Sequence, residues 1–178
     1  MTTARDVSAE FRSAAEASAT GEVFLTFATI MHPASTKVIR VANDVVDYQY
    51  LGELYVGCPF DITLLSDADD KPTAKISIQN VDREIGETIQ QLEDSPRLKL
   101  EVILLSQFSP ELDDSIGDNG ARTELGDTVV DYTADQLRMA KVSVDPMFVT
   151  ADIISYDYSQ EPWPFYRATK NRLPGCYR

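Results

Sequence analysis

The sequence predicts an α+β protein, in which an antiparallel β sandwich or barrel carries an N-terminal helix and a second helix packed on the sheet. Three observations lead to this class. Apolar and polar residues alternate in several stretches between Gly21 and Tyr158, which is the period of a half-buried strand. Two other stretches have the spacing of an amphipathic helix. Clusters of Gly, Pro and Asp separate these segments and predict turns.

The N-terminal stretch, from about Ala4 to Ala19, is expected to form the first helix. Thr3 and Asp6 stand in positions resembling a capping box. Its apolar and small residues recur at helical spacing, at Val7, Phe11, Ala14, Ala15 and Ser18. This face is only weakly apolar, so we expect the helix to pack lightly.

The chain after Gly21 is expected to continue as β strands. Residues 21–32 are apolar on both faces, as in a strand covered on both sides, and Pro33 ends them. Shorter strands are expected at 37–41 and 47–51. Two alternating stretches around the turn at 67–72 then predict a hairpin, with apolar positions at Phe60, Ile62, Leu64, Ala74, Ile76 and Ile78.

A second helix and four further strands are expected after this hairpin. Asp82 is a candidate N-cap, and the helical pattern ends before Pro96. The apolar residues of this helix recur at i, i+4 and i+7, at Ile85, Ile89 and Leu92. Strands are expected at 97–108, 128–132, 136–145 and 149–158. The apolar residues change phase between Leu137 and Val144, which predicts a β-bulge.

Length and composition suit one domain, because 178 residues that are 43% hydrophobic can fill one core. We expect an N-terminal helical arm (1–20), a β-rich domain (21–160) and a C-terminal arm (161–178). The longest unbroken apolar run, Val102 to Leu105, is far shorter than the roughly 20 residues of a membrane helix. No apolar block follows Arg5, so we expect no secretory signal and synthesis in the cytoplasm.

The protein is strongly acidic, with 16 Lys and Arg against 29 Asp and Glu and a net charge of −13. This argues against duplex nucleic acid and anionic membranes as partners, because phosphate groups attract clustered cations. Eight acids and one base lie between Ser109 and Asp135. We interpret Ser109 to Gly126 as a long exposed loop, whose first acidic residues are Glu111, Asp113, Asp114 and Asp118.

Few residues suggest catalysis or metal binding. His32 is the single histidine and stands before Pro33, so any triad mechanism would depend on it. Cys58 and Cys176 are 118 positions apart, which indicates neither a disulfide framework nor a Cys-x-x-Cys metal site. The stretch DDSIGDNGARTE does not follow the calcium-loop pattern, and the phosphate-loop, dinucleotide-binding and zinc-protease motifs are absent from the sequence. We expect no enzyme, no metal and no cofactor.

The C-terminal arm combines aromatic and basic residues. Seven of them are candidate interface residues: Trp163, Phe165, Tyr166, Arg167, Lys170, Arg172 and Tyr177. Such a segment can stack on the bases of single-stranded nucleic acid, dock on an acidic protein surface, or pack back on its own domain. On a chain of net charge −13, docking on an acidic surface of its own kind is the interpretation we favour.

Several stretches also resemble a family of tailed-bacteriophage proteins described only as a domain of unknown function. The resemblance runs from about Lys37 to the C-terminus, and its order is ELYVGCPFDITLL, AKISIQNVDREIGETIQQL, LKLEVILL, AKVSVDPMFVTADII and FYRATKNRLPGCYR. Its most specific part is a strand-to-helix junction that contains Asn80, Val81 and Asp82. A similar junction occurs in minor tail proteins of the lambda L type, which join the tail tube to the central hub and fibre.

This resemblance implies a structural component of the phage tail tip, or baseplate, located in the virion. It implies a ring of three copies as a hub or six as a distal-tail adaptor, in contact with the tube, tape measure, and hub or central fibre. An iron-sulfur cluster, as lambda-L-type proteins carry, is not expected with two cysteines. The alternatives are a tail-assembly chaperone absent from the finished particle and a small wall-degrading enzyme. If DNA passes through the ring, Glu111 and its acidic neighbours would suit the lumen, because they repel phosphates without binding a specific sequence.

Overall fold

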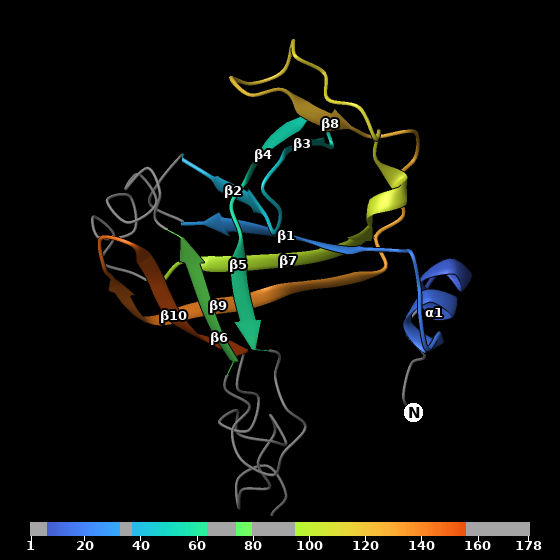
Figure 1. Ribbon diagram of the computed structural model, residues 1–178. Coiled ribbons are helices and arrows are strands. Elements are labelled where there is room, and N and C mark those ends of the chain that lie inside the picture. Colours follow the sequence, from blue (N-terminus) through green and yellow to red (C-terminus); the bar gives the residue numbers. More distant parts are fainter. Residues whose placement is uncertain (1–6, 33–36, 64–73, 80–94, 156–178) are drawn as a thin grey trace, which may run out of the picture.

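The computed structural model describes residues 7–32, 37–63, 74–79 and 95–155 of the chain. These residues form one α-helix, ten strands and a short 3-10 helix (Figure 1). The bounds are α1 (Ala9–Glu16), β1 (Phe24–Met31), β2 (Ile39–Ala42), β3 (Asp47–Tyr50), β4 (Glu53–Gly57), β5 (Phe60–Thr63), β6 (Ala74–Gln79), β7 (Arg97–Leu104), η1 (Leu105–Gln107), β8 (Ala121–Thr123), β9 (Tyr132–Val144) and β10 (Phe148–Ser155).

All ten strands belong to one mixed sheet, in the order β5-β6-β10-β9-β7-β1-β2-β4-β3-β8. Most neighbours are antiparallel, but β2 pairs with β4 and β3 pairs with β8 in parallel. The prediction of a closed or sandwiched antiparallel α+β fold is therefore wrong: the protein is mainly β, and its sheet is open with β5 and β8 at the edges. The β2–β4 pair is parallel because the hairpin of β3 and β4 returns the chain beside β2.

The sheet curls strongly because two strands that are far apart in its order are consecutive in the chain. β4 ends at Gly57 and β5 begins at Phe60, with only Cys58 and Pro59 between them. β4 nevertheless lies next to β2, while β5 forms the edge beyond β6. Figure 1 shows the consequence: β5 and β6 fold back across β7 and β9.

The curled sheet has an apolar core on each face. The aliphatic core collects residues from β1, β2, β5, β6, β7, β9 and β10, including Ala28 and Ile30 of β1. The aromatic core lies on the opposite face and includes Leu25 and Phe27 of the same strand. Side chains alternate between faces along a strand, so β1 contributes to both cores. The expectation of a strand covered on both sides is confirmed.

The aromatic core is built around Phe27, whose side chain is 1% exposed. Four rings lie with centroids 5.0 to 5.7 Å from its own, namely Tyr48, Tyr50, Tyr55 and Phe108. These spacings are those of favourable stacked and edge-to-face pairs. The rings come from β1, β3 and β4 and from the residue after η1, so the cluster joins the β3–β4 hairpin to the rest of the sheet.

Burial raises the pKa of Tyr48 and Tyr50 above the ordinary tyrosine value of 10.0. For Tyr48, a hydrogen bond donated to the Asp44 carboxylate adds to this effect. For Tyr50, the nearby charge of Glu101 does so. Both hydroxyls therefore hold their protons more tightly in the folded protein than in the unfolded chain.

The protein is expected to lose stability as the pH rises above about 10, because unfolded Tyr48 and Tyr50 then ionise while the folded ones stay neutral. Below that pH both states keep these protons and the effect vanishes. Circular dichroism and tyrosine absorbance followed together from pH 8 to 12 would check this. The Tyr50→Phe variant should unfold at a higher pH than the parent. An unchanged alkaline midpoint in that variant would contradict the assignment.

Helix α1 packs beside the start of β1 and of β9 through few contacts. The Ser8 hydroxyl caps it by accepting a hydrogen bond from Phe11 N at 3.0 Å. Asp131 Oδ1 accepts a hydrogen bond from Ser8 N at 3.0 Å, and the Phe11 ring packs on Phe24 with centroids 4.8 Å apart. Ala14 is its buried residue. The predicted helix was longer than α1. The few contacts of α1 agree with the light packing that its weakly apolar face predicts.

The second predicted helix, from Asp82 to Ser95, and the junction residues Asn80 and Val81 fall outside the described residues, except for Ser95. The predicted hairpin is confirmed, because β5 and β6 pair antiparallel. The predicted bulge is also confirmed: the β9–β10 register shifts near Lys141, whose φ is 49°. The predicted strand at 128–132 is wrong, since β9 begins at Tyr132.

Candidate binding cleft

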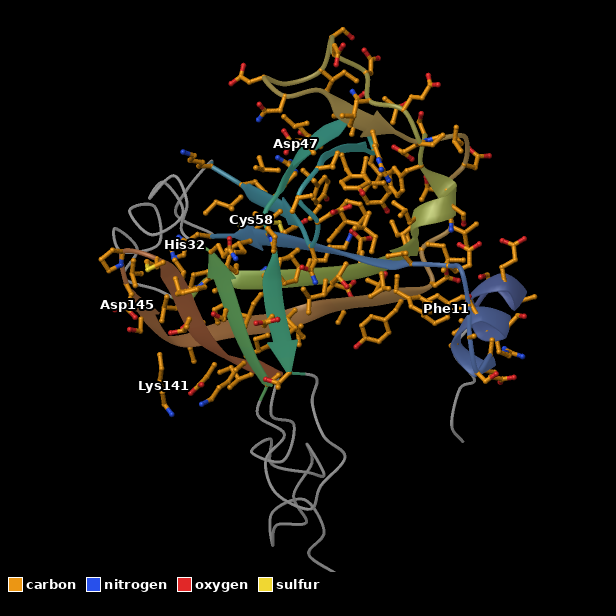
Figure 2. All side chains as sticks on the ribbon, viewed as in Figure 1. Phe11, His32, Asp47, Cys58, Lys141 and Asp145 are labelled. Carbon is orange, nitrogen blue, oxygen red and sulfur yellow. The ribbon has the colours of Figure 1, made fainter. Side chains whose placement is uncertain are left out.

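Polar side chains of the β2–β3 link and of the first residue of β3 hold β4 and β5 in position. Asn43 Oδ1 accepts a hydrogen bond from Phe60 N at 3.0 Å, and Asp47 Oδ1 accepts one from Gly57 N at 2.7 Å. The backbone adds Cys58 N to Ala42 O at 3.0 Å. Figure 2 shows Asp47 above Cys58, on the side of the sheet where β2, β3 and β4 meet. These bonds hold one wall of a cleft.

The cleft has a volume of about 590 Å³ and lies between β2, β4 and the loop of residues 109–120, which we call the acidic loop. Its apolar lining includes Ile39, Val41, Val45, Leu54, Val56 and Leu112. Several of these side chains are open to solvent: Val45 is 79% exposed, Leu112 46% and Val56 45%. Along β4, Leu54 and Val56 face the cleft while Tyr55 faces the aromatic core. The outer face of β4 is therefore apolar and partly open to solvent.

Polar groups frame this apolar surface. The Arg40 guanidinium forms an ion pair with Glu53, with Nη2 and Oε1 3.2 Å apart. Lys37, Asp47, Gln79 and Asn119 also line the cleft. An apolar lining with a few polar groups at its border is the usual composition of a protein-binding surface.

The acidic loop is pinned at its base by backbone hydrogen bonds. Asp113 N donates to Ala121 O at 2.9 Å, and Ala121 N donates to Asp113 O at 3.2 Å. At its tip, Gly117 adopts a φ of 67°, and a Cβ there would lie 3.5 Å from Leu54 Cδ2. Glycine is suited to this left-handed conformation. The loop borders the cleft, which Leu112, Asn119 and Gly120 line.

The acidic side chains predicted to be exposed are exposed: Glu111, Asp113, Asp114 and Asp118. Hydrogen bonds from the Ser115 hydroxyl (2.6 Å) and backbone NH (3.0 Å) lower the pKa of Asp113, so this carboxylate stays charged to lower pH than usual. The prediction of an unbroken loop from Ser109 to Gly126 is wrong, because residues 121–123 form β8, which pairs with β3.

The other residues singled out from the sequence lie elsewhere. Cys58 is buried between β4 and β5, borders the cleft, and donates from Sγ to Gln79 O at 3.2 Å. His32 is 7% exposed at the end of β1. The seven aromatic and basic candidates from Trp163 to Tyr177 fall outside the described residues. Among the described residues no group of three His, Cys, Asp or Glu could hold a metal ion.

Sequence reasoning missed the apolar residues of the cleft. Two signals were available: adjacent valines at Val45 and Val46 inside an otherwise polar turn, and Leu54 and Val56 on either side of Tyr55. The second pattern is the alternation of a strand. The second signal was missed because β4 was not predicted.

Residues 10–167 of the chain match a family described as Domain of unknown function (DUF1833). The chain belongs to the DUF1833 family. The match includes all ten strands, the acidic loop and every residue of the cleft, so these are features of a DUF1833 domain. The expectation of a family of unknown function is confirmed. No curated protein matches the chain. No helix in the described ranges is long and apolar enough to cross a membrane.

Proposed function

We propose that this DUF1833 protein is a structural component of a bacteriophage tail tip. Several copies form a ring, three as a hub or six as a distal-tail adaptor, which joins the tail tube to the central hub or fibre. Its partners are further copies of itself and other tail proteins, and its place is the tail tip of the virion. The number of copies in the ring decides whether it is a hub or an adaptor.

One observation carries the proposal: an open apolar cleft, bordered by an exposed acidic loop, lies on an extensively hydrogen-bonded sheet. Exposed apolar surfaces of this kind mark sites of protein association. A ring subunit needs a rigid body that presents such a surface to its neighbour. The resemblance of the junction at Asn80, Val81 and Asp82 to minor tail proteins supplies the link to phage tails.

The acidic loop is assigned to the lumen of this ring. Glu111, Asp113, Asp114 and Asp118 are exposed on one loop, and their charges would repel DNA passing through the ring. A ring reconstruction in which these side chains point away from the symmetry axis would refute the lumen assignment while leaving the tail-tip role intact.

Light scattering on the purified protein, followed by class averages from electron microscopy, tests the proposal. A closed ring of three or six copies is the expected result and separates hub from adaptor. Mass spectrometry of purified virions distinguishes a structural part from an assembly chaperone, because only the structural part stays in the particle. Absence from virions would refute the tail-tip role, whatever the mass in solution.

A further inference from the structure

We propose that the cleft between β2, β4 and the acidic loop is the docking site for residues 163–178 of a neighbouring copy of the chain. This inference rests on the proposed self-assembly and names the contact that would hold it together. Three observations favour this segment of a second copy: its apolar character, its charge and the direction of β10.

The apolar character of the two surfaces matches. The cleft is lined by branched aliphatic side chains that water reaches, above all Val45, Val56 and Leu112. Residues 163–178 contain the single tryptophan of the protein, Trp163, together with Phe165. Aromatic side chains that fill apolar pockets are the strongest anchors in protein interfaces. A volume of about 590 Å³ lies within the range of pockets that enclose a ligand.

The segments around the cleft and residues 163–178 have opposite net charges. Lys37, Arg40 and Asp47 are charged residues of the cleft lining. The segments around the cleft, residues 37–57 and 109–124, carry eight acids and three bases, a net charge of 3 − 8 = −5. Residues 163–178 carry four bases and no acid, a net charge of +4. Of the two cations that line the cleft, Arg40 is paired with Glu53. Complementary charge at the border of an apolar contact selects the partner and speeds association.

The direction of β10 favours a neighbouring copy over the same chain. Phe148, the first residue of β10, pairs with Gln79, which lines the cleft. Ser155 is its last residue and lies 155 − 148 = 7 residues further, about 24 Å along a strand. Figure 1 shows β10 running toward the end of the sheet opposite to β3 and β8. Residues 156–162 would have to return this whole distance fully extended to bring Trp163 to the cleft of its own copy.

The fluorescence of Trp163 in the full-length protein tests the inference, because no other tryptophan contributes. We expect blue-shifted, buried emission at concentrations where the copies associate, and a shift to the red on dilution. Trp163→Phe should weaken self-association by about tenfold or more, as expected for an aromatic anchor.

A substitution in the cleft gives the complementary measurement. Val45→Lys places a charge in the apolar lining at a side chain that is 79% exposed, so the fold should remain intact by circular dichroism. We expect it to weaken self-association by about tenfold and to leave Trp163 exposed to solvent. Val129→Lys is the matched control: Val129 is 52% exposed, does not line the cleft, and should change association less than about twofold.

Three outcomes would overturn the inference. Buried emission that does not depend on concentration would place the segment on its own chain. Exposed Trp163 within an assembled ring would mean that another surface forms the contact between copies. The proposed function would not be affected by that result. Equal association of the Val45→Lys and Val129→Lys variants would remove the cleft from the interface. Absence of the protein from virions would instead refute the proposed function. Failure of the docking inference and failure of the proposed function can therefore be told apart.

Discussion

Phe27→Ala is expected to lower the free energy of unfolding by about 3 to 5 kcal/mol. The Phe27 ring is 1% exposed and lies between four other rings at 5.0 to 5.7 Å. Truncation removes a large buried apolar surface, and it also removes the ring pairs, each worth about 0.5 to 1.5 kcal/mol beyond burial. The surrounding rings are held by strands on several sides, so the cavity cannot collapse easily.

Urea denaturation followed by circular dichroism measures this loss. Phe148→Ala is the matched control, since it removes the same ring from a side chain that is 41% exposed, and it should cost about 1 kcal/mol or less. A Phe27→Ala variant no less stable than Phe148→Ala would show that the aromatic core does not hold the β3–β4 hairpin to the sheet.

Gly57→Ala is expected to destabilise the protein by up to about 3 kcal/mol. A Cβ at this position would lie 2.6 Å from the backbone C and O of Val46 and 2.7 Å from its N. Backbone atoms cannot rotate away as a flexible side chain can, so the β2–β3 link must move from β4. That movement strains the bond from Gly57 N to Asp47 and opens the wall of the cleft.

Gly21→Ala is the control for this prediction, because nothing lies within 4 Å of a Cβ at Gly21. This variant should be unchanged or more stable by about 0.4 to 1 kcal/mol, since alanine restricts the unfolded chain. Thermal unfolding of both variants checks the difference. Equal midpoints would mean that the link and β4 have room to separate without loss of stability.

Local patterns were sufficient for most strands but not for β4 and β8. β1, β6, β7 and β10 have either continuous apolar residues or clear alternation, and each was predicted near its observed place. The turn before β4 has positive φ at both Leu51 (53°) and Gly52 (75°). Such turns usually have Asn or Asp at the first position, and leucine there conceals the hairpin from sequence inspection.

The candidate site was only half predictable for a related reason. The exposed acids of the loop were predicted, because a dense run of charge cannot be buried. The apolar half of the cleft was not, because Val45, Val56 and Leu112 come from three separate segments. Each alone is an ordinary apolar residue, and only their proximity makes a binding surface.

By itself, the sequence determined which residues are inside: the alternating apolar positions of β6 and the doubly covered β1 form the cores as their patterns indicate. Only the tertiary structure decided how the strands associate. Alternation specifies which face of a strand is buried, but it carries no information on which strand lies beside it. The parallel pairing of β2 with β4, the open edges at β5 and β8, and the cleft depend on contacts between distant segments. Such contacts form only when the whole sheet is assembled.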